Sequence, residues 1–135
     1  MNKFIFCYPI KLLSLNHSFI TLRNGKRCRS KEYKDFAKEI FVVVNRNVDF
    51  KKFDNLFCYK NHELHAELTF YTPDLYTKAG KLSKKSCDID NVIKPLFDNI
   101  LIGKIDDSAI TQLVVKKLYD IEYSFSLVLE IVDRK

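Results

Sequence analysis

The sequence contains no tryptophan and little glycine or proline. The scarcity of glycine and proline argues against a low-complexity or disordered chain. Three glycines, three prolines and one methionine occur among the 135 residues. No segment is low in complexity, and hydrophobic residues make up 47% of the chain, which is enough for one sizeable core. We therefore exclude intrinsic disorder and expect residues 1–135 to form a single domain.

Cysteines and long apolar runs are also scarce. The four cysteines lie far apart and form no Cys-x-x-Cys pair, so the sequence gives no support to a structural zinc site. No apolar run approaches the length of a membrane span. The apolar N-terminal stretch lacks the small-residue cleavage site of a signal peptide. We therefore expect a cytoplasmic protein with free thiols and no membrane contact.

Positive charge is in excess, with 23 lysines and arginines against 17 aspartates and glutamates and a formal net charge of +6. A basic domain suits a polyanionic partner, most commonly nucleic acid. Eight of the cations fall in two short runs: Arg23, Lys26, Arg27 and Arg29 in the first, and Lys78, Lys81, Lys84 and Lys85 in the second. Such runs are often only solvated loops, but beside a site that acts on nucleic acid the second run would form a track for phosphates.

The spacing of apolar residues predicts both strands and helices. Strands are expected over 3–8, 63–71, 110–118 and 123–132, and a hairpin over 19–30 with a two-residue turn at Asn24–Gly25. Helices are expected from an N-cap at Ser30 to Val44 and over 91–102. Residues 48–60 fit a short helix or a loop, and residues 72–86 a loop. We predict the α+β class, with a mixed open sheet flanked by two main helices.

The same spacing predicts where several side chains lie. The first helix should bury the face that carries Tyr33, Phe36, Ala37, Ile40, Phe41 and Val44. In the second helix, Pro95 should fall in the first turn, where its missing N–H costs least, and Gly103 should mark the end. Tyr71 and Tyr76 flank the second basic run and could either stack on unpaired bases or pack against the protein.

Two acidic pairs bracket the second predicted helix. Asp88 and Asp90 lie two residues apart, and on extended chain their side chains would point the same way. A helix and a short turn could then bring Asp106 or Asp107 back to them. Three close carboxylates repel unless a divalent cation joins them, and hard oxygen ligands suit Mg²⁺ or Mn²⁺. Lys94 follows Asp90 by about one helical turn and could face the same point.

Purely structural roles explain the same residues. Asp90 could be a helix N-cap, and Asp106–Asp107 has an ordinary turn composition. Spacing alone favours these roles over a metal site. The histidines of "HELH", residues 62–65, have neither the i, i+4 spacing nor the helical context of a zinc protease motif.

The stretches "DIDNVIKPLFDNI" and "IDDSAITQLVVKK" together resemble the RusA family of Holliday junction resolvases. That family's signature is Asp-x-Asp-Asn, a lysine four residues after the second aspartate, an apolar helix with a further aspartate, and Asp-Asp-Ser/Ala before a strand. The matching positions here are Asp88, Asp90, Asn91, Lys94, Asp98, Asp106, Asp107 and Ser108. One difference is that Ser86–Cys87 and lysines precede the motif, where the family often has arginines.

The resemblance implies a function and a set of roles. The family comprises homodimeric, Mg²⁺-dependent endonucleases of bacteria, phages and prophages that nick four-way DNA junctions symmetrically. By analogy, Asp88, Asp90 and Asp107 would bind the metal and Lys94 would assist at the phosphate, with Asn91 and Asp106 in support. Asp98 would sit away from the metal.

Two other functions remain open on the sequence alone. One is a metal nuclease that prefers other branched DNA, such as flaps or forks. The other is a non-catalytic nucleic-acid-binding module, which would bind in a salt-sensitive manner without any dependence on metal.

Overall fold

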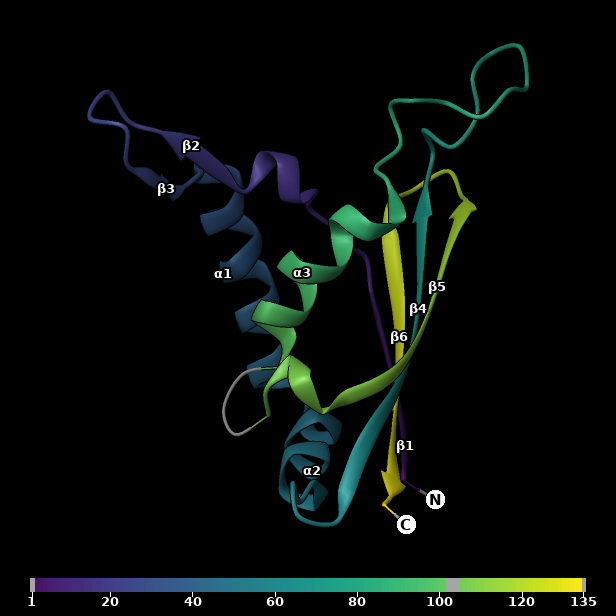
Figure 1. The fold of residues 1–135 in the computed structure, drawn as a ribbon. Helices are drawn as coiled ribbons and strands as arrows, with labels where there is room; N and C mark the ends of the chain where they lie inside the picture. Colours follow the sequence, from purple (N-terminus) through teal and green to yellow (C-terminus); the bar gives the residue numbers. More distant parts are fainter. Residues whose placement is uncertain (1, 102–104, 135) are drawn as a thin grey trace.

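A four-stranded open sheet with helices on one side forms the framework of the computed structural model, which describes residues 2–101 and 105–134 (Figure 1). Its elements are β1 (Lys3–Tyr8), β2 (Phe19–Thr21), β3 (Arg27–Arg29), α1 (Lys31–Arg46), α2 (Val48–Leu56), β4 (His62–Thr72), α3 (Ile89–Ile100), β5 (Ile110–Tyr119) and β6 (Ser124–Asp133), with short 3-10 turns η1 (Leu15–His17) and η2 (Asp107–Ala109). The predicted α+β class with a mixed sheet is confirmed. No helix within these two described stretches could span a membrane, being either too short or too polar.

The sheet has the order β1-β6-β4-β5. The β1–β6 and β6–β4 pairs are antiparallel, whereas β4 and β5 run parallel. Parallel neighbours need a long crossover, and α3 lies within it. In β4 the inward residues are Leu64, Ala66, Leu68 and Phe70, all buried, as their alternation predicts.

The helix α1 begins at the predicted N-cap. The Ser30 side chain accepts a hydrogen bond of 3.1 Å from the Tyr33 N–H, and Ser30 itself is buried. Ile40 is fully buried, but the prediction that Phe41 faces the core is wrong, since this side chain is 56% exposed. Successive helical residues differ by about 100°, so Ile40 at the centre of the buried stripe places Phe41 outside it.

The ambiguous segment after α1 is a helix. In α2, Phe50 and Phe53 are buried and contact β1, with ring centroids 5.1 Å apart for Phe6–Phe50 and 5.5 Å for Phe4–Phe53. The Asn47 side chain caps the helix by accepting from the Phe50 N–H at 3.0 Å. Two aromatic anchors therefore turn a short polar segment into a helix that tertiary packing stabilises.

The two basic runs form turns with the same hydrogen bonds. In the first, Leu22 N–H donates to Lys26 O at 2.8 Å and Gly25 N–H to Leu22 O at 2.9 Å; Gly25 has φ +82°. In the second, Thr77 N–H donates to Lys81 O at 2.7 Å and Gly80 N–H to Thr77 O at 2.9 Å; Gly80 has φ +81°. Each is a three-residue loop closed by a left-handed glycine. We call residues 19–29 and 75–83 the first and second basic hairpins.

These turns correct two predictions. The Asn24–Gly25 turn has three loop residues rather than two, because only Gly25 adopts a positive φ. The expected loop at 72–86 contains a hairpin, since Tyr76 and Leu82 form a β-bridge and the Ser83 N–H donates to Leu75 O at 2.9 Å.

The helix α3 begins two residues earlier than predicted. It starts at Ile89, so Asp88 occupies the N-cap and Asp90 the first turn, and the predicted N-cap at Asp90 is wrong. Pro95 therefore lies in the helix interior, where it removes a backbone hydrogen bond to the carbonyl of Asn91. The predicted extension to Ile102 and the stop at Gly103 lie outside the described residues.

The buried side of α3 gives a test of the core. Leu96 is fully buried, so Leu96→Ala should lower the free energy of unfolding by about 2–5 kcal/mol through reduced burial and a residual cavity. Leu82→Ala is the matched control, because Leu82 is 74% exposed and its truncation should change stability by less than about 0.5 kcal/mol. Urea denaturation measures both variants, and equal losses of stability would contradict this packing.

Candidate active site

Asp88 and Asp90 lie at the amino end of α3, and both are exposed. The Asp88 carboxylate makes no capping hydrogen bond, and within 2–101 and 105–134 neither residue takes part in an ion pair. The partial positive charge of a helix amino terminus favours carboxylates there. The extended geometry assumed for this pair is wrong, because Asp90 is helical. Two carboxylates with accessible oxygens therefore stand at one helix end.

Lys94 lies between two carboxylates in the middle of α3. Its ammonium is 2.8 Å from Asp107 Oδ2 and 3.0 Å from Asp98 Oδ1. These contacts, with Asp107 first and Asp98 second, raise the pKa of Lys94 well above its ordinary value. Lys94 therefore stays a cation. The chain that follows α3 does bring Asp107 back to this helix, where it contacts Lys94.

Asp98 is a contact that sequence reasoning missed. We expect it to lie away from the metal, which stays a prediction, but its carboxylate also holds Lys94 from the next helical turn. The i, i+4 spacing of Lys94 and Asp98 was the available signal.

The second acidic segment is held by a residue that follows α2. The Tyr59 hydroxyl accepts a hydrogen bond from the Asp106 N–H and lies 3.4 Å from the Asp106 carbonyl oxygen. The Ser108 side chain lowers the pKa of the exposed Asp106 carboxyl, with smaller contributions from the backbone of Ser108 and Asp107. Tyr59 thus positions the turn that presents Asp107.

The first acidic segment is held from β5. The Lys117 ammonium donates to Ser86 Oγ at 2.9 Å and to the Cys87 carbonyl oxygen at 3.1 Å, directly before Asp88. A half-buried lysine on the core side of an edge strand thereby fixes the entry to α3.

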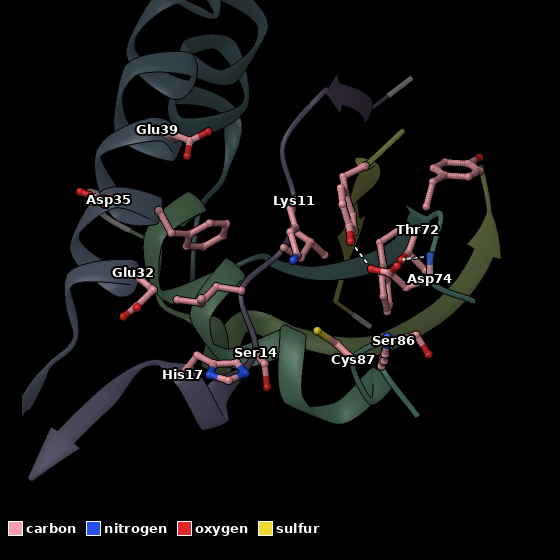
Figure 2. Close-up of a pocket in the computed structure, with 17 residues that line it drawn as sticks. Lys11, Ser14, His17, Glu32, Asp35, Glu39, Thr72, Asp74, Ser86 and Cys87 are labelled. Atoms are coloured by element: carbon pink, nitrogen blue, oxygen red, sulfur yellow. Dashed lines mark hydrogen bonds between the residues drawn. The ribbon is translucent and has the colours of Figure 1, made fainter. Parts of the chain in front are cut away.

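A cavity of about 440 Å³ opens beside this entry (Figure 2). Three carboxylates of α1 line one side of it: Glu32, Asp35 and Glu39. On the other side Tyr123 donates a hydrogen bond to Asp74, which raises the pKa of Tyr123. Its lining has four carboxylates against two lysines, Lys11 and Lys85, so the interior of this cavity is a poor place for a DNA phosphate.

A second cavity, of about 310 Å³, adjoins Lys94 and Asp107. It lies between α3 and β5, and Phe97 and Leu113 give it apolar walls. Charged groups with apolar neighbours on one side interact more strongly than they would in bulk water.

The predicted DNA-binding cations lie on the two basic hairpins and just after the second. Both hairpins project from the same end of the molecule, on either side of the amino end of α3 (Figure 1). Seven of the eight side chains belong to residues exposed at these turns or their flanks: Arg23, Lys26, Arg27, Lys78, Lys81, Lys84 and Lys85; Arg29 is exposed on β3. Tyr76 is half exposed and contacts Tyr119, with ring centroids 6.1 Å apart, whereas Tyr71 is half-buried.

The donor chemistry of the acidic segments fits a hard divalent cation. Asp88, Asp90 and Asp107 offer only carboxylate oxygens, which Mg²⁺ and Mn²⁺ prefer. Within the part of the chain that the structure describes, however, no three histidine, cysteine, aspartate or glutamate side chains form a group that could hold a metal ion. Convergence of the three carboxylates stays a prediction.

Comparison with known proteins gives one family. The family model described as Endodeoxyribonuclease RusA matches residues 12–130. No curated protein matches the chain. The matched range includes both acidic segments, Lys94 and both basic hairpins.

The Lys94 ion pairs make a prediction about titration. NMR titration of its side chain should give a pKa above the value of about 10.4 for free lysine. Because the folded-state pKa exceeds the unfolded one, the stability gained from these pairs is complete below about pH 10 and is lost as pH rises through the folded-state pKa. Asp98→Asn should lower this pKa only in part, since Asp107 remains. Titration of Lys94 at or below the free value would contradict the geometry.

Proposed function

This chain belongs to the RusA endodeoxyribonuclease family, and we propose that it hydrolyses phosphodiester bonds in branched DNA, above all in four-way junctions. The observation that carries the proposal is the arrangement around α3. Its amino end bears the exposed Asp88 and Asp90, and its middle bears Lys94 paired with Asp107. Two basic hairpins flank this helix in a chain of net charge +6.

We propose that Asp88, Asp90 and Asp107 hold Mg²⁺, for which Mn²⁺ can substitute. When bound, such an ion activates water and neutralises charge on the phosphate under attack. Asp107 must then share its carboxylate between the cation and Lys94, and Asp98 keeps the ammonium in place when it does. Lys94, protonated throughout, donates to a phosphate oxygen as negative charge develops.

Positioning residues support these groups from outside the crossover. Lys117 holds the backbone before Asp88, and Tyr59 holds the backbone before Asp107. With both segments tethered, the carboxylates lose less freedom when they bind a cation. The neighbouring Asn91 and Asp106 are supporting residues in this proposal.

The proposal also covers the oligomeric state, the DNA contacts and the cellular location. A two-fold homodimer presents two sites related by symmetry, which suits paired, symmetric nicks in the near-symmetric four-way junction. The lysines of the second basic hairpin and its flank contact the backbone phosphates: Lys78, Lys81, Lys84 and Lys85. We place this activity in the cytoplasm of a bacterial or phage-infected cell, with residues 1–135 acting as one endonuclease domain.

Asp88→Asn should abolish cleavage while preserving the fold and junction binding. Asparagine caps helices as well as aspartate does, so α3 should keep its start, but the neutral amide is a poor ligand for a hard cation. Asp133→Asn is the matched control, because Asp133 lies at the end of β6 with its side chain 86% exposed. Cleavage rate, junction affinity in EDTA and melting temperature separate the effects. Full activity of Asp88→Asn would refute the assignment.

A cleavage assay tests the substrate directly. A labelled four-way junction, a flap, a fork and a linear duplex of one sequence are each incubated with Mg²⁺, Ca²⁺ or EDTA. Paired cuts in the junction that require Mg²⁺ are expected. Preferential cutting of the flap or fork would change the assigned substrate but would leave the proposed hydrolysis of phosphodiester bonds in place. Salt-sensitive binding without cutting in any condition would replace the nuclease by a binding module.

A further inference from the structure

The first basic hairpin carries a cluster of alternating arginines and aromatic rings. The Arg27 guanidinium lies 4.3 Å from the centre of the Phe19 ring, and that of Arg29 lies 4.8 Å from the same ring and 4.0 Å from the Tyr33 ring. The two rings are themselves stacked, 6.5 Å apart at 26°. Phe19 faces Arg29 across the β2–β3 pair, so the pairing register creates these contacts.

This cluster is anchored to the helix of the candidate active site. Tyr33 is buried, and its hydroxyl accepts a hydrogen bond of 3.0 Å from the Asn99 side-chain amide of α3. The same amide donates to the Pro95 carbonyl oxygen at 2.7 Å. The arginines therefore rest on a ring whose position relative to α3 is fixed.

The arginines keep their hydrogen-bonding edges available. Among the described residues, neither Arg27 nor Arg29 forms an ion pair with a carboxylate or a side-chain hydrogen bond. Stacking uses the flat face of a guanidinium and leaves its in-plane N–H groups free, in a geometry that matches two phosphate oxygens. Held over aromatic rings and without an acidic partner among the described residues, these arginines are preorganised for an anion.

Both arginines face the same cavity as Lys94. This cavity, of about 350 Å³, is lined by Arg27, Arg29 and Lys94, with Asp98 as its one carboxylate among the lining residues. Asp98 is already paired with Lys94 at 3.0 Å. The excess of positive charge favours an anionic ligand, and the cavity adjoins the residue that we place at the scissile phosphate.

We propose that Arg27 and Arg29 form a second phosphate site, which holds another phosphodiester group of the strand that is cut. This inference rests on the proposed function and deepens it. Lys94 lies between the two sites, because it lines both this cavity and the one beside Asp107. The strand would run from the acidic segments past Lys94 to the first basic hairpin, so the arginines fix which phosphate reaches the metal ligands.

The test compares two double variants in junction binding, measured in EDTA so that cutting does not interfere. Arg27→Gln/Arg29→Gln should weaken binding by about tenfold or more, because charged hydrogen bonds to phosphate are removed. The slope of log affinity against log salt should become shallower by about 0.9 for each phosphate that the variant no longer neutralises. Lys51→Gln/Lys52→Gln removes the same charge from exposed positions on α2 and should change neither quantity by a comparable amount.

Neutral backbone substitutions then locate the bound phosphate. A single methylphosphonate, moved along the strand around the cut, should weaken wild-type binding at one position away from the scissile bond and leave the arginine double variant unaffected there. Arg27→Lys/Arg29→Lys keeps the charge without the planar fork and should restore the salt slope while recovering only part of the affinity. Circular dichroism checks that each variant is folded.

The outcomes distinguish a failure of the second phosphate site from a failure of the proposed nuclease function. The phosphate site is refuted if the two glutamine double variants behave alike, or if no methylphosphonate position distinguishes wild type from the arginine variant. Wild-type protein that fails to bind or cut the junction refutes the proposed function instead, whatever the variants do.

Discussion

Parallel pairing of β4 with β5 is the constraint on which the rest of the structure depends. Parallel neighbours cannot be joined by a tight turn, so the chain from Thr72 to Ile110 must travel back along the sheet before β5 begins. The apolar side of α3 is buried in making that return, and residues 88–107 of the crossover carry every candidate catalytic group. The candidate site is thus built on the connection between β4 and β5, and Lys117 and Tyr59 hold its two ends in place.

Much of the framework was predictable because a helix or strand that packs on one face has buried residues at a fixed spacing along the sequence. The alternation in β4 and the stripe on α1 both reflect one-sided packing, and both were identified correctly apart from Phe41. The start of α3 was misplaced because Asp88 and Asp90 are equally good N-cap residue types, so local sequence does not choose between them, and the structure has the cap at Asp88. α2 was ambiguous because nine residues are too few for periodicity to decide, and its two buried rings depend on β1.

The site was predictable only where its parts are neighbours in sequence or match the family signature. The spacing within residues 88–107 indicated the carboxylates and Lys94, and family resemblance favoured a catalytic role for them. Lys117 and Tyr59 could not be found this way. Their partners lie 30 and 47 residues away in sequence, and neither residue type suggests a tether on its own. The aromatic support under Arg27 and Arg29 was equally hidden, because strand register determines it.

The two glycine-closed turns have a consequence for how such a protein can diversify. Gly25 and Gly80 each have open space where a side chain would begin, and both hairpins stand clear of the four-stranded sheet. Changes in the length or charge of the two turns themselves, residues 23–25 and 78–80, therefore leave the packed interior and the acidic segments undisturbed. The charge of these two turns can therefore vary between related chains while the packing around α3 and the stacked support of Arg27 and Arg29 are kept.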